Sequence, residues 1–278
     1  MTQANTKIAV VTGASRGLGR GIARALGSKG MTVYLTGRSL EKGLSEAASE
    51  VEAQGGRAIP VPCDHANDAQ VDDLFQFVRK ESGKLDLLVN NAAAVYPADL
   101  TSEGPFWEKP LKLADMIDVG LRSHYVASYY AAPLMTEAKH GLIANISFYG
   151  AVSYFHGAAY GAAKAGTDKM TRDMAVDLRP YGVAAVSIWP GFILTDELRS
   201  GGLPPEYADQ LPMMERPEFT GLVIEALMND PELLNFSGDA LIGAELGLKY
   251  HITDLDGKQP PSHRETMGSP VLANRDPH

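Results

Sequence analysis

Six short apolar runs recur at regular intervals along the chain. They read KIAVVTG, MTVYLTG, RAIPVPC, LDLLVNN, GLIANIS and GVAAVSIWPG, and Val, Ile, Leu and Ala dominate them. Apolar and polar residues do not alternate strictly within these runs, so both faces of each strand are expected to be buried. This pattern is typical of parallel strands that are covered by helices on both sides.

Helical periodicity fills the intervals between the runs. It predicts helices at about 17–29, 41–54, 67–81, 112–138, 157–179 and 217–229. Strands that alternate with helices build βαβ units, in which consecutive strands lie parallel. The sequence therefore predicts an α/β fold with a doubly wound sheet.

Composition narrows the class of protein. With 278 residues, 45% of them hydrophobic, the chain fits one large α/β domain or two small ones. The net charge is −9, and charged residues of both signs are scattered along the chain without a long basic run. Nucleic acid is therefore not an expected partner, whereas small molecules or further copies of the chain are. Cys63 is the single cysteine, MTQANTKIAV lacks a signal sequence, and no apolar run approaches the ~18 residues that span a bilayer. We therefore expect a cytoplasmic enzyme with no membrane segment.

The segment TGASRGLG, residues 12–19, follows the first strand directly and opens the first helix. Its glycines, Gly13, Gly17 and Gly19, permit a tight turn and let backbone N–H groups approach a pyrophosphate. The start of the helix adds the positive end of its dipole. An ordinary strand-to-helix turn also uses glycine, but three glycines in this context favour a dinucleotide.

The end of the second strand indicates which dinucleotide is bound. An NAD-preferring enzyme normally places a carboxylate there to accept hydrogen bonds from the adenosine ribose. This chain has Gly37 in that place, followed by Arg38, and Arg16 lies in the glycine turn. Guanidinium groups suit a 2′-phosphate, so NADP(H) is predicted in preference to NAD(H). The alternative is that both arginines are solvated surface charges.

A tyrosine and a lysine lie four residues apart in YGAAKAG, at the start of an alanine-rich helix. At this spacing Tyr160 and Lys164 share a helix face, where an ammonium group favours ionisation of a neighbouring phenol. Inert helices show the same spacing, so the pair alone does not separate a catalytic role from an ordinary contact.

Five motifs occur together in the order and spacing of a known family. TGASRGLG, LVNNAA (88–93), NIS (145–147), YGAAK (160–164) and WPGFILT (189–195) resemble the classical short-chain dehydrogenase/reductases, over roughly residues 6–250. The resemblance implies one Rossmann-fold domain over residues 1–278, with a mostly parallel seven-stranded sheet, and an oxidoreductase acting on a carbonyl or secondary alcohol. Within the family the chain looks most like the dehydrogenase/reductase SDR family member 1 branch, on YLTGRSLEK, FWEKP, DVGLRSHY, NFSGDAL and DLDGK. That branch is described as NADPH-dependent carbonyl reductases for steroids and assorted carbonyl compounds.

The resemblance also implies roles for single residues. Ser147 would hydrogen-bond the substrate oxygen, Tyr160 would act as acid and base, and Lys164 would hold the nicotinamide ribose. A phenol suits this proton transfer, but bringing its pKa from ~10 to ~7 requires about 4 kcal/mol of preferential stabilisation of the phenolate. The neighbouring lysine and, in the oxidised complex, the nicotinamide charge are expected to act in that direction.

The same resemblance predicts the cofactor contacts and no metal site. Asp64 would contact the adenine amino group, Asn90 would line the cofactor cleft and Thr195 would reach the nicotinamide carboxamide. The full set is Gly13, Ser15, Arg16, Gly17, Leu18, Gly19, Arg38, Asp64, Asn90, Tyr160, Lys164, Ile193 and Thr195.

Two positions depart from the usual pattern of the family. Gly120 in IDVGLRS stands where most classical members have an Asn that completes a proton relay, and Ala93 in NNAA replaces a glycine. We expect a backbone carbonyl to hold the relay water at a helix irregularity near Gly120. The departure leaves open a rival class, a dinucleotide-binding regulator or scaffold with lost turnover. A methyltransferase also has a glycine turn after its first strand, but does not explain Arg38 together with the Tyr/Lys pair.

The resemblance also implies that residues 192–216 form the mobile substrate loop of the family, and Gly201 and Gly202 suit its hinges. Its apolar side chains favour a medium-sized hydrophobic carbonyl, although methionines that only pack under the loop are an equal alternative. These side chains are Phe192, Leu198, Leu203, Met213 and Met214. His156 either faces the cleft or caps the entrance of the following helix, whereas His124 and Trp107 receive no role.

The chain ends in a polar stretch with Pro and Gly and without periodicity, at about 259–278. It is expected to be a loose tail or to pack against a neighbouring subunit. The long helices predicted at about 112–138 and 157–179 carry apolar or small side chains on more than one face, as if a partner covers one of them. A homodimer or homotetramer, usual in the family, is therefore expected.

Overall fold

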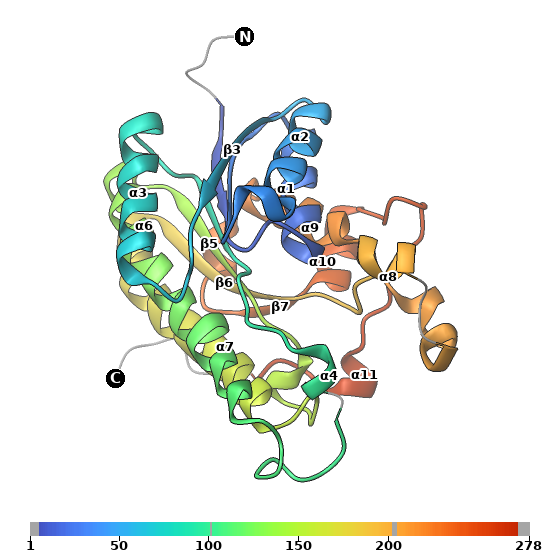
Figure 1. Cartoon of the computed structure of the whole chain (residues 1–278). Helices are drawn as coiled ribbons and strands as arrows, with labels where there is room; N and C mark the ends of the chain where they lie inside the picture. Colours follow the sequence, from blue (N-terminus) through green and yellow to red (C-terminus); the bar gives the residue numbers. More distant parts are fainter. Residues whose placement is uncertain (1–5, 101, 202–204, 272–278) are drawn as a thin grey trace.

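Within residues 6–100, 102–201 and 205–271, the parts that the computed structural model describes, seven strands form one parallel sheet (Figure 1). The strand order is β3-β2-β1-β4-β5-β6-β7, which confirms the doubly wound Rossmann arrangement predicted from the sequence. The strands are β1 (Ile8–Val11), β2 (Thr32–Gly37), β3 (Arg57–Pro62), β4 (Leu87–Asn90), β5 (Gly141–Ile146), β6 (Val183–Trp189) and β7 (Ala240–Ile242).

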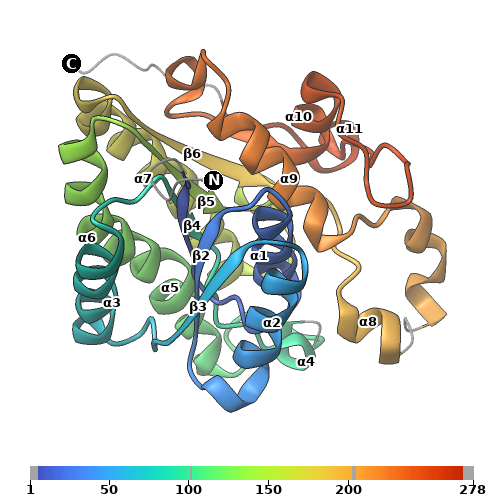
Figure 2. The same cartoon turned by 90° about the horizontal axis from the view of Figure 1, so that it is seen from above.

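Two groups of helices cover the two faces of the sheet (Figure 2). One face is covered by α1 (Gly17–Ser28), α2 (Ser45–Ala53) and α9 (Pro217–Met228), and the other by α3 (Asp68–Ser82), α6 (Ser123–Ala138) and α7 (Ala158–Leu178). Shorter helices are α4 (Pro97–Leu100), α5 (Asp115–Ile117), α8 (Asp196–Gly201), α10 (Gly243–Tyr250) and α11 (Arg264–Met267). In the described part of the chain, none of these helices has the length and apolar composition that crossing a bilayer requires.

The central strands bury side chains on both faces. In β1, Ala9 and Val11 belong to the core under α1 and α9, whereas Ile8 and Val10 belong to the core under α3 and α6. Full burial of an aliphatic side chain contributes ~1.5–3 kcal/mol. The uninterrupted apolar runs therefore stabilise the sheet through two separate cores.

Two predicted helices are interrupted by glycine. The helix predicted at 112–138 breaks between α5 and α6, where Gly120 has a φ of +145°. The helix predicted at 41–54 becomes regular only at Ser45, because Gly43 has a φ of +86°. Such φ angles end the regular helical hydrogen bonding, and the apolar spacing does not reveal them. The helices predicted at 157–179 and 217–229 correspond to α7 and α9.

The C-terminal stretch folds back onto the domain as far as residue 271. The Arg264 guanidinium pairs with both carboxylate oxygens of Glu245, at 2.8 and 2.6 Å, and the His263 N–H donates to the Tyr149 hydroxyl at 3.1 Å. These polar contacts hold the segment, so the prediction of a loose tail is wrong for residues 259–271. Residues 272–278 lie outside the described residues.

Candidate active site

The ends of β1 and β4 are joined at the point where the strand order reverses. Thr12 follows β1, and its hydroxyl oxygen accepts hydrogen bonds from the N–H groups of Asn91 and Ala92, both at 2.9 Å. The Asn91 amide donates to the carbonyl oxygens of Thr12 and Gly13, at 2.9 and 3.2 Å. Ligands of doubly wound sheets bind in the crevice at such a switch point.

The glycine turn has the open backbone that a phosphate group requires. Gly13 and Gly17 have φ angles of +66° and +56°, and a Cβ on Gly13 would lie 2.9 Å from the Cα of Ala92. A Cβ on Gly19 would lie 2.5 Å from the carbonyl oxygen of Gly13. Arg16 is the N-cap of α1 and makes no side-chain cap hydrogen bond, so the first N–H groups of the helix are available to phosphate oxygens. The turn therefore fits a pyrophosphate.

The end of β2 lies against this turn. Gly37 is buried, and a Cβ on it would lie 3.2 Å from the Cβ of Ser15, so the backbone of the two segments is close. Arg16 and Arg38 are both exposed. Leu18 is half-buried and packs against the core under α1. The two guanidinium groups are thus accessible to a ligand phosphate, whereas Leu18 anchors the first turn of the helix.

A buried histidine stands next to the predicted adenine contact. Asp64 follows β3, and its carboxylate accepts a hydrogen bond from the N–H of Ala66 at 3.0 Å. The Nε2 of His65 lies 2.7 Å from the hydroxyl of Thr36, which also accepts a hydrogen bond from the N–H of Gly13 at 3.2 Å. Burial lowers the pKa of His65 to about 4. The neutral imidazole links the ends of β2 and β3 to the glycine turn, although no sequence motif singles it out.

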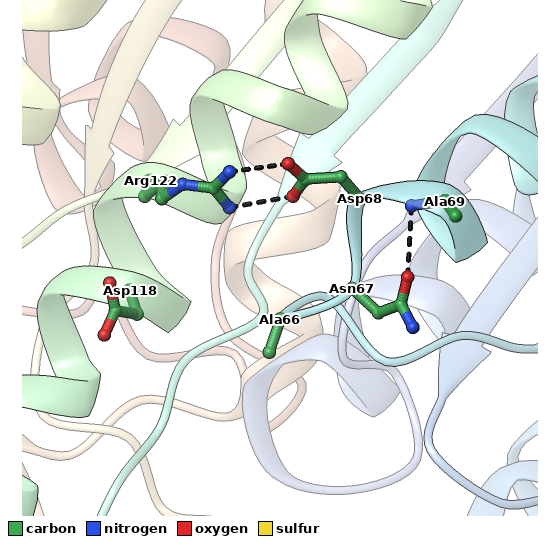
Figure 3. Close-up of a pocket in the computed structure, with 6 residues that line it drawn as sticks. All are labelled: Ala66, Asn67, Asp68, Ala69, Asp118 and Arg122. Atoms are coloured by element: carbon green, nitrogen blue, oxygen red, sulfur yellow. Dashed lines mark hydrogen bonds and ion pairs between the residues drawn. The ribbon is translucent and has the colours of Figure 1, made fainter.

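A groove of about 610 Å³ lies beside this segment, at the start of α3 (Figure 3). Arg122 forms a bidentate ion pair with Asp68, at 2.8 and 2.5 Å, and Asn67 caps α3 by accepting a hydrogen bond from the N–H of Ala69 at 3.1 Å. The lining is Ala66, Asn67, Asp68, Ala69, Asp118 and Arg122. None of these six is a predicted site residue, so this groove is not the predicted catalytic centre.

The structure turns Asn90 away from the cleft. Its side chain is fully buried, and its Nδ2 donates to the Oδ1 of Asn145 at 2.8 Å and to the hydroxyl of Ser128 at 2.9 Å. A buried amide needs partners inside the protein, and these hold it between β5 and α6. The prediction that the Asn90 side chain lines the cofactor cleft is therefore wrong. The neighbouring Asn91 is the residue whose side chain reaches the glycine turn.

Ser147, Tyr160 and Lys164 come together between the end of β5 and the first turns of α7. The buried Ser147 donates its hydroxyl proton to the carbonyl oxygen of Lys164 at 3.2 Å. The Nζ of Lys164 donates to the carbonyl oxygen of Ile146 at 3.0 Å and lies 5.6 Å from the centre of the Tyr160 ring. A Cβ on Gly150 would lie 2.6 Å from the Cε1 of Tyr160, so this glycine makes room for the ring.

Burial dominates the electrostatics of this trio. It raises the pKa of the Tyr160 phenol above its ordinary value, because the charged form is disfavoured away from water. For the same reason it lowers the pKa of the Lys164 ammonium to about 8, and the charge of Asp168 acts in the opposite direction. The expected fall in the pKa of Tyr160 is therefore not produced by the protein alone.

Aromatic side chains surround the Tyr160 ring. Ring centres of Phe148, Phe155 and His156 lie 6.5, 6.0 and 5.3 Å from it, and Phe192 lies 5.9 Å from Phe148. His156 thus lies beside the tyrosine ring. The tyrosine ring therefore has apolar, aromatic surroundings.

The predicted substrate loop leaves β6 through a short neck. Ile193 bridges to Glu215, and the N–H of Leu194 donates to the carbonyl oxygen of Glu215 at 2.9 Å. The methyl group of Thr195 lies 3.8 Å from the position of a Cβ on Gly17, so the neck brings Thr195 against the glycine turn. Of the predicted lining, Leu198 and Met214 are half-buried and Met213 is exposed. Gly202 and Leu203 lie outside the described residues.

The helix irregularity predicted at Gly120 is present, since this residue has a φ of +145°. The carbonyl oxygen of Gly120 accepts a hydrogen bond of 3.3 Å from the Thr167 hydroxyl. One turn further, His124 is buried with its Nε2 3.1 Å from the carbonyl oxygen of Ala92, and burial lowers its pKa to about 3. Since a carbonyl only accepts, the Nε2 of this neutral imidazole carries the proton. Trp107 is 70% exposed.

Known proteins resemble this chain over most of its length. The family model described as short chain dehydrogenase matches residues 7–202. The chain is 41% identical over 265 residues to dehydrogenase/reductase SDR family member 1 of Mus musculus, covering 91% of this chain and 84% of the relative. Its Homo sapiens counterpart is 42% identical over 267 residues, covering 91% and 85%. A single-residue variant of actinorhodin polyketide ketoreductase, solved with NADPH, matches with a TM-score of 0.76 at 24% identity, covering 87% of this chain and 97% of that one, which shows the shared fold.

Proposed function

The chain belongs to the short-chain dehydrogenase family and is an oxidoreductase, and we propose that it reduces carbonyl compounds with NADPH, or runs the reverse reaction. The proposed substrates are ketones and aldehydes, including steroid-like and other hydrophobic carbonyls. The observation that carries the proposal is the convergence of Ser147, Tyr160 and Lys164 at the carboxyl edge of the sheet. The predicted family and branch are confirmed by the matches, whereas these residue roles stay predictions.

Each member of the trio has a chemical task that its surroundings support. When bound, NADP(H) supplies the hydride or accepts it. The raised pKa of Tyr160 keeps the phenol protonated at neutral pH, as donation of a proton to the substrate oxygen requires. Ser147 donates its hydroxyl to the same oxygen and stabilises the charge that develops there. The Lys164 ammonium lowers the cost of leaving a phenolate at Tyr160.

Several features support NADP(H) as the cofactor. The glycine turn fits a pyrophosphate, and Arg16 and Arg38 are exposed beside it, where guanidinium groups can bind a 2′-phosphate. Gly37 leaves no carboxylate to accept hydrogen bonds from ribose hydroxyls or to repel that phosphate. Asp64 would contact the adenine, and Ile193 and Thr195 would contact the nicotinamide from the neck of the substrate loop.

The aromatic side chains near Tyr160 support hydrophobic substrates. Phe148, Phe155 and Phe192 stand within 7 Å of one another or of the tyrosine ring, at the start of the substrate loop. Aromatic rings favour flat or polycyclic partners through offset or edge-to-face contacts.

A homodimer or homotetramer in the cytoplasm is proposed as the working form of the protein, and light scattering with size exclusion tests the assembly. Tyr125 and Tyr129, 54% and 64% exposed on α6, support a subunit contact there.

NADPH absorbance with a panel of ketones, aldehydes, quinones and steroids tests the activity. We expect Tyr160→Phe to abolish nearly all turnover while NADPH binding, measured by fluorescence, persists. Tyr154→Phe is the matched control, because Tyr154 lies just before α7, the helix that carries Tyr160, but is 89% exposed. Near wild-type rates in Tyr160→Phe would overturn the assignment. NADPH binding without turnover of any panel member would favour the regulator or scaffold instead.

A further inference from the structure

A carboxylate lies next to the catalytic trio and has no part in the reaction proposed above. Asp168 follows Lys164 by one helical turn on α7, just as Lys164 follows Tyr160. The three residues therefore occupy positions i, i+4 and i+8, which lie along one face of a helix. Lysine and aspartate side chains at this spacing are neighbours.

The indole of Trp189 anchors the Asp168 carboxylate. The Nε1–H of Trp189, at the end of β6, points at both carboxylate oxygens, at 3.2 and 3.1 Å. Burial raises the pKa of Asp168, and the neighbouring polar groups of Ser147, Ser187 and Trp189 act in the opposite direction. Because Trp189 is fully buried, the carboxylate is held by a rigid partner. The carboxylate is thus held against the end of β6, one helical turn from the lysine.

The Lys164 ammonium sits among few ionisable groups. Tyr160 precedes it on α7, and His124 approaches from α6 but is kept neutral by burial. Asp168 is the negative partner whose charge raises the pKa of Lys164, against the larger lowering effect of burial. A buried ammonium without a counter-charge tends to lose its proton. The charge of Lys164 therefore depends on the aspartate one turn away.

We propose that Asp168 is a positioning residue of this active site, which keeps the Lys164 ammonium charged. The inference rests on the proposed function, because it assigns Asp168 an effect on the groups that handle the substrate proton. A purely structural Asp168–Trp189 contact would affect stability and leave the titration of Lys164 unchanged.

Asp168→Asn tests the proposal, since it preserves the size and an acceptor oxygen for Trp189 while removing the charge. We expect the alkaline limb of the kcat profile to move to lower pH by about one unit, because an opposite charge at this range shifts a pKa by ~1–3 units. At the pH where wild-type Lys164 is half-charged, kcat should fall about fivefold, and NADPH affinity should change less than about twofold. Asp173→Asn is the matched control: it makes the same change on the same helix, at an exposed carboxylate paired with Lys169.

A second readout does not depend on turnover. In protein labelled with [ε-13C]lysine, the Lys164 signal, assigned with Lys164→Arg, should titrate at lower pH in Asp168→Asn than in wild type. Asp168→Glu, which restores the charge, should return it toward the wild-type value. An unchanged Lys164 titration in Asp168→Asn overturns the proposal. If instead the titration moves but wild type reduces no carbonyl, the proposed function fails and the Asp168–Lys164 link stands. Should Asp168→Asn not fold, the smaller Asp168→Ser removes the same charge and is expected to give the same shift.

Discussion

The ammonium group of Lys164 donates a hydrogen bond of 3.0 Å to the carbonyl oxygen of Ile146. Ile146 ends β5 and directly precedes Ser147, so this bond holds the lysine head at the strand end that carries the serine. An ammonium has three donors, and this carbonyl uses one of them. The lysine is therefore positioned by the backbone, and this bond leaves donors of the ammonium group for other acceptors.

Replacing Lys164 by methionine should lower the catalytic rate while the protein still folds. The apolar chain keeps much of the packing, but the charge that supports a phenolate at Tyr160 is lost, so kcat/KM for carbonyl reduction should fall by ~10²–10⁴. Steady-state NADPH oxidation measures the loss, and circular dichroism checks the fold. Lys169→Met, at an exposed residue paired with Asp173 on the same helix, should retain the wild-type rate. A Lys164→Met enzyme with more than about a tenth of the wild-type kcat/KM would speak against the role.

Coenzyme choice should depend on Arg38. If its guanidinium binds a 2′-phosphate, Arg38→Met should raise the dissociation constant of NADPH by ~10-fold or more, as expected for losing ~1.5–3 kcal/mol of a charged hydrogen bond. The dissociation constant of NADH should hardly change. Fluorescence titration with both coenzymes gives the ratio. Arg57→Met, at another exposed arginine at the far end of the neighbouring strand β3, serves as the control. Equal losses for NADPH and NADH in Arg38→Met would show that the residue does not read the 2′-phosphate.

The doubly wound sheet followed from the sequence because its signals are local and repeated. Six of the seven strands are continuous apolar runs, and the glycine turn directly joins the first run to a helix, so neighbouring residues suffice to recognise both. The short β7 has no such run and follows only from the resemblance to the family. The spacing of Ser147, Tyr160 and Lys164 is equally local. Their meeting in one site follows from the parallel order of the strands.

Other features depend on contacts between distant segments, which a single sequence does not record. Asn90 ends β4, at the edge where the cleft is expected, but Asn145 and Ser128 are its partners inside the core. The C-terminal stretch is polar, yet hydrogen bonds and an ion pair such as that of Arg264 with Glu245 hold it against the domain. In the sequence Asp168 looks like an ordinary acidic residue of a helix, because its contact with Trp189 of β6 appears only in the folded structure.

Acid should destabilise the protein through its buried histidines. Burial lowers the pKa of His65 to about 4 and that of His124 to about 3, whereas both titrate near 6.5 when unfolded. Between these values the unfolded chain binds more protons than the folded one, so the free energy of unfolding falls as the pH drops below 6.5. His65 alone should account for about 2–3 kcal/mol of this loss between pH 7 and 4.5.

A difference measurement isolates that contribution from other titrating groups. His65→Asn keeps a polar side chain beside the Thr36 hydroxyl but removes the titration. Urea unfolding of both proteins should show that the stability gap between wild type and His65→Asn narrows on acidification. A gap that does not change with pH would mean that His65 is charged in the folded state.

Replacing Gly120 by Asn, the residue that most of the family carries at this position, should destabilise the protein. Its φ of +145° and ψ of −22° lie outside the left-handed region that Asn tolerates, so Gly120→Asn should lower the free energy of unfolding by ~1–3 kcal/mol. Steric overlap is not the cause, because a Cβ there would meet the Cβ of Ala93 at an ordinary 3.8 Å. Gly30→Asn is the control: with a φ of +73° and nothing within 4 Å, it should cost less. If Gly120→Asn instead proved as stable as wild type and turned over faster, the result would show that the proton relay of this protein lacks only the Asn side chain at position 120. We expect the opposite, since the backbone here is shaped for glycine.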